Sequence, residues 1–195
     1  MKKLLLIAAV AVFGFSNVNA QDEKTTTGGF AEGDVYVSGT VGFNSSAFGD
    51  AKSNDLTFSP SVGYFISENI ALEANLLIGS GENVLDTKRS SFGGGLGATY
   101  FFTPSDQFSF TVGAGVNYAS NKVEPDGGSE AKSNSFGIAV SPGLNYFVSD
   151  CFSLRASMGA LSYRSEKEDG ADDAATSFGL NLDLSDIVFG IVYKF

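Results

Sequence analysis

Residues 108–118, Phe-Ser-Phe-Thr-Val-Gly-Ala-Gly-Val-Asn-Tyr, alternate strictly between apolar side chains and small or polar ones. A period of two residues is typical of a β-strand with one apolar face. The same pattern recurs along the chain, over residues 34–43, 55–66, 69–80, 90–102, 107–119, 135–148, 151–163 and 176–195. So many alternating segments are what a transmembrane β-barrel requires of its sequence.

The first twenty residues have the features of an export signal. A basic start at Lys2 and Lys3 precedes an apolar run over residues 4–15, and Ala20 ends a segment that suits signal peptidase. We therefore predict a signal peptide over 1–20, a flexible polar segment over 21–33 and a barrel domain over 34–195. After Ala20 no apolar stretch approaches the ~20 residues that a helical span needs.

The connections between the predicted strands alternate in length. Those at 67–69, 103–106 and 149–150 are short, whereas those at 44–54, 81–89, 120–134 and 164–175 are long and polar. Bacterial barrels have short periplasmic turns and longer outer loops, so we predict an all-β, eight-stranded antiparallel up-and-down barrel in the bacterial outer membrane, with both termini in the periplasm.

The sequence also contains an internal repeat. Residues 59–68 recur 82 residues later at 141–150, which indicates two halves built alike. Pro60 and Pro142 fall at matching places and suggest a bulge or bend there, because proline cannot donate to the ladder. In the last segment the apolar parity changes near residues 185–186. A bulge would restore the phase, and a turn would give nine strands.

Glu73 and Arg155 are the constellation that we single out. The predicted outward positions contain no charge, and the strand charges Glu73, Arg155, Asp183 and Lys194 all fall on the inward parity. Glu73 and Arg155 occupy equivalent places in the repeat, on strands three and seven, which face each other in a ring of eight. We predict an ion pair in the lumen, with Asp183 and Lys194 as further candidate members. Either it gates the lumen or it neutralises interior charge, and the second is favoured because buried charges are nearly always paired.

Aromatic residues mark the ends of the strands. Tyr64, Tyr100, Tyr146 and Tyr193 fall near the periplasmic ends on the apolar face, as in a membrane-interface girdle. A family resemblance rests on four features, which are the signal peptide, the eight alternating segments, the segment from Gly63 to Glu73 and the Gly-Ile-Val-Tyr-Lys-Phe ending. In these features the chain resembles the small outer-membrane barrels of the OmpA/OmpX-like "porin family". The resemblance implies that Ile191, Tyr193 and Phe195 form the signal recognised by the barrel-assembly machinery.

Composition excludes several functions. The chain contains no histidine and one cysteine, Cys151, so the histidine-dependent chemistry of barrel enzymes and a zinc site both lack their residues. We expect no enzyme activity and no cofactor. Without Lys2 and Lys3, 22 acidic residues face 10 basic ones, which argues against nucleic acid as a partner.

We expect outer-membrane lipid as the main partner of a monomeric barrel. Three roles stay open from the sequence: a structural or surface role with a filled lumen, a narrow channel for ions or small solutes, and an adhesin that binds an unidentified ligand through its acidic loops.

Overall fold

The computed structural model describes residues 28–48, 51–83, 87–157, 160–181 and 187–195. Within these ranges no helix is long and apolar enough to cross a membrane. The strands are β1 (Val35–Phe48), β2 (Ala51–Phe65), β3 (Ile70–Glu82), β4 (Lys88–Phe101), β5 (Phe108–Glu124), β6 (Ala131–Phe147), β7 (Phe152–Ser157), β8 (Ala160–Glu168), β9 (Ala175–Asn181) and β10 (Val188–Lys194). The predicted signal peptide, the first part of the predicted flexible segment and Asp183 lie outside the described residues.

The sheet closes on itself. Consecutive strands from β1 to β6 pair antiparallel, and β10 pairs with both β7 and β1. β7 and β8 lie end to end along β6, and β10 and β9 lie end to end along them. The ring therefore contains eight strands, which confirms the predicted barrel. Because β9 and β10 run in one direction, the nine-strand alternative is wrong.

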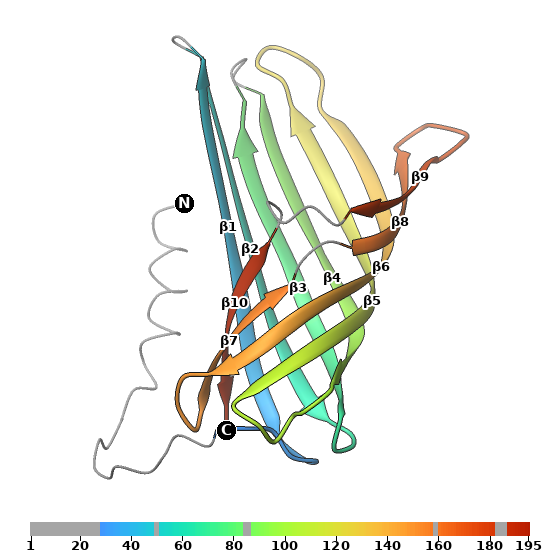
Figure 1. The fold of residues 1–195 in the computed structure, drawn as a ribbon. Coiled ribbons are helices and arrows are strands. Elements are labelled where there is room, and N and C mark those ends of the chain that lie inside the picture. Colours follow the sequence, from blue (N-terminus) through green and yellow to red (C-terminus); the bar gives the residue numbers. More distant parts are fainter. Residues whose placement is uncertain (1–27, 49–50, 84–86, 158–159, 182–186) are drawn as a thin grey trace.

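The two ends of the barrel differ. At one end, hereafter the short-turn end, connections of a few residues follow β2, β4 and β6, and the C-terminus lies there (Figure 1). At the opposite end the β1–β2 and β5–β6 hairpins extend well beyond β10. The strands are longer there than predicted, since β5 continues to Glu124 and β6 starts at Ala131. The apolar alternation marks only the part of a strand that faces lipid, and hydrogen-bond pairing continues beyond it with polar side chains.

Side-chain direction follows the predicted parity. On β5, Phe110 is 62% exposed and its neighbour Ser109 is 2% exposed, so the apolar side chains point outward and the small polar ones into the lumen. Phe178 and Leu180 of β9 are exposed at even positions, whereas Phe189 and Ile191 of β10 are exposed at odd positions. The phase change that the sequence indicates thus falls between β9 and β10.

Pro60 is accommodated without a bulge. Phe58 pairs with Ile78 and Ser61 pairs with Asn75, so the β2–β3 register is the same on both sides of the proline. The expected bulge is wrong at this position. Pro60 has no N–H to offer the opposite strand, and the Ser59 hydroxyl instead donates a 2.8 Å hydrogen bond to the carbonyl oxygen of Leu76. A neighbouring side chain therefore satisfies an acceptor that proline would leave unpaired.

Replacing Ser59 with alanine should leave the Leu76 carbonyl unsatisfied in a wall that faces lipid. We expect Ser59→Ala to lower the free energy of unfolding by about 1–3 kcal/mol, measured by urea titration of the folded barrel in lipid vesicles.

The matched control is Ser141→Ala, since Ser141 is the repeat equivalent of Ser59 on β6 and its hydroxyl makes no hydrogen bond to a described residue. Its cost should stay below about 0.5 kcal/mol. Equal costs for the two substitutions would contradict the assigned role of Ser59.

Candidate functional site

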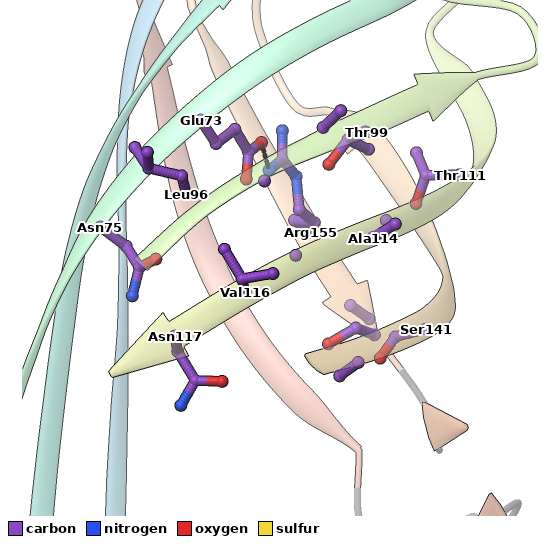
Figure 2. A pocket seen from close by; sticks show the side chains of 17 residues that line it. Glu73, Asn75, Leu96, Thr99, Thr111, Ala114, Val116, Asn117, Ser141 and Arg155 are labelled. Carbon is purple, nitrogen blue, oxygen red and sulfur yellow. Dashed lines mark hydrogen bonds and ion pairs between the residues drawn. The ribbon is translucent and has the colours of Figure 1, made fainter. Parts of the chain in front are cut away.

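An ion pair crosses the lumen. The Arg155 guanidinium on β7 donates through Nη1 to Oε1 of Glu73 on β3 at 2.5 Å, and the Tyr36 hydroxyl on β1 donates to the same carboxylate oxygen. Figure 2 shows the two charged side chains meeting between opposite walls. Both are largely buried, with side-chain exposures of 17% for Arg155 and 21% for Glu73. The structure thus brings together the two residues that the repeat places opposite each other.

Glycines make room for this network. Glu73 pairs with Gly63 on one side and Gly97 on the other, and Arg155 pairs with Gly190. A Cβ atom on Gly63 would overlap the ring of Tyr36, which lies flat across that position. An eight-stranded barrel has a lumen just wide enough for side chains to fill, so small neighbours leave room for long side chains. The glycines are therefore part of the site.

The guanidinium has a second set of partners. Its carbon lies 5.1 Å from the centre of the Tyr36 ring and 5.4 Å from that of Phe101, within the range of cation–π attraction. Nε and Nη2 of Arg155 are buried and donate no hydrogen bond to the described residues. The charge of Arg155 is thus balanced by one carboxylate and two ring faces. Removing either would leave a buried charge poorly compensated.

The short-turn end is filled by aromatic rings. Phe65, Phe101 and Phe147 are at most 1% exposed, and each is the last residue of its strand, β2, β4 or β6. Each follows a tyrosine, so Tyr-Phe recurs three times with the tyrosine pointing outward and the phenylalanine inward. Sequence reasoning singled out the tyrosines and missed the phenylalanines. The repeated dipeptide was the signal that could have found them.

Phe30 completes this cluster. It is 3% exposed and joins Tyr36, Ala71, Val192 and the three strand-end phenylalanines in one buried group. Residues 28–33 belong to the segment expected to be flexible, yet Phe30 packs inside the barrel mouth. Lys194, the residue that follows Tyr193 on β10, does not reach Glu73. Its Nζ pairs with Asp34 Oδ2 at 3.5 Å and donates to the Gly29 carbonyl.

A cavity of about 320 Å³ lies beside the ion pair. Its lining includes both charged residues and the hydroxyls of Thr99, Thr111 and Ser141 (Figure 2). Asn75 and Asn117 both flank Gly95 in the sheet and extend the lining away from the short-turn end. The cavity can hold water or a small polar solute. Within the described residues no group of three metal-binding side chains exists.

The predicted girdle and terminal residues lie on the outer face. Tyr64, Tyr100 and Tyr146 are 42–49% exposed near the short-turn end, and Tyr193 is half-buried between the rings of Phe152 and Phe195. Ile191 and Phe195 are exposed beside it. Amphipathic rings at this height suit the headgroup region of a bilayer.

The opposite end carries a charged cluster. Lys122 pairs with Glu124 on its own strand and with Glu130 across the β5–β6 hairpin, and Lys132 pairs with Glu130 at 2.9 Å. The hydrogen bonds from Lys122 and Lys132 lower the pKa of Glu130 below its usual value. Glu130 therefore stays ionised to a lower pH than an isolated glutamate, and the cluster is lost only as the pH falls through that lowered pKa.

A double-mutant cycle tests the ion pair. Glu73→Ala and Arg155→Ala should each reduce the free energy of unfolding by about 3–5 kcal/mol, because each leaves the other charge buried and unpaired. The double variant leaves no such charge, so it should cost less than the summed single costs by about 1–3 kcal/mol. Additive costs would show that the two side chains do not interact.

Gly63→Ala tests the supporting glycine. The new methyl group must displace the Tyr36 ring from Glu73, and we expect a loss of about 1–3 kcal/mol in unfolding free energy. Gly39→Ala is the control, because a Cβ there would meet its nearest neighbour, Phe58, at an ordinary 3.7 Å. Comparable losses for both glycines would refute the crowding argument.

No curated protein gives a significant match to the sequence. The structure is similar to Neisserial surface protein A (TM-score 0.55, 19% identity, 83% of this chain and 97% of that one). It is also similar to OprG from Pseudomonas aeruginosa (TM-score 0.53, 17% identity, 86% of this chain and 98% of that one). The N-terminal barrel of P. aeruginosa OprF is similar too (TM-score 0.50, 17% identity, 85% of this chain and 100% of that one).

At these identities the structural likeness shows the fold alone. The family model for the outer membrane protein beta-barrel domain matches residues 7–195, which is nearly the whole chain. The chain therefore belongs to the outer membrane protein beta-barrel domain family, and its location is the bacterial outer membrane.

Proposed function

We propose that the protein is a non-conducting, non-enzymatic barrel with a structural or cell-surface role. In this family the short-turn end faces the periplasm and the long hairpins face outward. The observation that carries the proposal is the network of Glu73, Arg155 and Tyr36, which spans the lumen from three strands. An ion that crossed the barrel would have to separate Glu73 from Arg155 and Tyr36 inside the lumen, where both charged side chains are largely buried.

The shape of the lumen supports a closed barrel. Eight strands enclose a space that side chains can fill, and the cluster of Phe30, Tyr36, Phe65, Phe101 and Phe147 fills it on the periplasmic side. Rings packed in this way leave no polar surface to hydrate a passing ion. In this proposal the ion pair neutralises interior charge and obstructs the lumen, and it does not act as a switch.

The outer hairpins support a surface role. β5 and β6 continue past the apolar band to Glu124 and Ala131, and their tips carry the cluster of Lys122, Glu130 and Lys132. Paired strands hold these charges in fixed places, which suits contact with neighbouring lipid headgroups or a surface partner. We further propose that Ile191, Tyr193 and Phe195 present the assembly signal, since they line the outer face of the last strand.

A narrow channel is the second candidate, favoured by the cavity of about 320 Å³ beside the ion pair. In that function the cavity would be a vestibule, and small ions would pass when the Glu73–Arg155 pair separates. The two candidates differ in whether the unmodified protein carries any current.

Planar-bilayer recording of the purified, refolded protein decides between them. We expect no channel events at voltages that a bilayer tolerates, with a conducting porin recorded in the same membranes as positive control. Folding is verified by the heat-dependent shift of barrels in gel electrophoresis. Reproducible single-channel steps from the folded fraction would contradict the proposal and establish the narrow channel.

A further inference from the structure

The segment 28–34, which precedes β1, enters the periplasmic mouth of the barrel. The ring of Phe30 lies 4.6 Å from Phe65, 4.9 Å from Phe147, 5.2 Å from Tyr36 and 5.4 Å from Phe101, measured between ring centres. These four rings come from β1, β2, β4 and β6, on different sides of the wall. Phe30 thus sits at the centre of a ring of aromatic side chains, in the stacked and edge-on arrangements that aromatic pairs favour.

The backbone of the segment is fixed on both sides of Phe30. The Phe30 N–H donates to the Pro104 carbonyl at 2.7 Å, and the Gly33 N–H donates to the Phe65 carbonyl at 2.9 Å. Gly33 has a φ of 90°, a conformation that favours glycine, and lets the chain turn from the mouth into β1. The barrel wall therefore offers this segment defined hydrogen bonds as well as an apolar socket.

Two glycines give the segment its close fit. A Cβ on Gly28 would come within 2.6 Å of Phe147 and of the Ser149 carbonyl oxygen, and one on Gly29 would overlap the backbone of Ser105. Residues with side chains cannot approach the two periplasmic turns this closely. The sequence Gly28-Gly29-Phe30 thus combines two residues without side chains and one large ring.

Lys194 closes the fourth side. Three descending strands end in Tyr-Phe, and β10 ends in Tyr193-Lys194 before the terminal Phe195. The Lys194 ammonium group donates to the Gly29 carbonyl and pairs with Asp34 at 3.5 Å. It also lies 5.8 Å from the centre of the Phe147 ring. The charged residue of this mouth therefore adds a third hydrogen bond to the backbone of the segment.

We propose that the periplasmic mouth is a docking site for residues 28–30 of this chain, and that Phe30 acts there as a plug. The plug is a second seal, in series with the Glu73–Arg155 network. The inference rests on the proposed function, because a seal has meaning only in a barrel that does not conduct. It adds that a second, separate barrier exists and names the residues that form it.

Docking is tested by chymotrypsin digestion of the refolded protein in detergent, with cleavage of the Phe30–Ala31 bond followed by mass spectrometry. The parent should resist, and Gly29→Val should be cleaved at this bond about tenfold faster or more, since local protection reports local opening. Gly179→Val is the matched control, because a Cβ there meets nothing within 4 Å, and it should behave as the parent. Equal cleavage of parent and Gly29→Val would overturn the docking site.

Sealing is tested by bilayer recording of four proteins whose folding is verified. The parent, Phe30→Ser and the Glu73→Ala/Arg155→Ala double variant should all be silent, because each retains at least one seal. The triple variant should conduct small ions. Removing both charges together avoids leaving either one unpaired.

The outcomes separate the two claims. A double variant that conducts as well as the triple variant, or a silent triple variant, would overturn the plug and leave the non-conducting parent as proposed. Channels in Phe30→Ser alone would overturn the series arrangement, because the central network would then form no barrier. Channels in the parent would overturn the proposed function and the plug together.

Discussion

In the hydrocarbon of a membrane no water is present to satisfy a backbone N–H or C=O, and each unpaired group costs several kcal/mol. This constraint requires the sheet to close, and it does so where β10 pairs with both β1 and β7. It also explains why Pro60 occurs where it does. Proline has no N–H to donate to the Leu76 carbonyl, and the Ser59 hydroxyl donates to it instead. This acceptor therefore keeps a hydrogen bond, and the β2–β3 register is the same on both sides of Pro60.

Closure with eight strands determines what the interior can be. The lumen is only as wide as its side chains, so large inward residues need small neighbours, as Gly63 provides for Tyr36. Along the axis the interior changes from aromatic at the periplasmic mouth, through the Glu73–Arg155 network, to the cavity beyond it. A cation and an anion that meet in the middle let both charges be buried. The same arrangement obstructs passage, and a filled lumen is thus a consequence of the strand number.

Much of this architecture was predictable because a barrel imposes period two on its sequence. Parity alone put Glu73 and Arg155 inside, and the 82-residue repeat put them opposite each other. The ends of β5 and β6 that lie opposite the short-turn end were not predictable. Their backbones pair outside the membrane, where the side chains are polar and leave no apolar alternation. The packing of Phe30 was also missed. A single phenylalanine among glycines and polar residues has no periodicity. Its contacts become evident only when the phenylalanines of the three Tyr-Phe strand ends are known to surround it.

The barrel wall turns alternate residues of each strand to lipid and to a closed interior. Spin labels on single cysteines, introduced one by one from residue 70 to residue 78 of β3 in a Cys151→Ser background, test it in lipid vesicles. We predict high accessibility to oxygen dissolved in the bilayer at even positions such as Leu72 and Leu76, and low accessibility at odd positions such as Glu73 and Asn75. An accessibility profile without a period of two, or with its maxima at the odd positions, would contradict the assignment of the even residues of β3 to the lipid face.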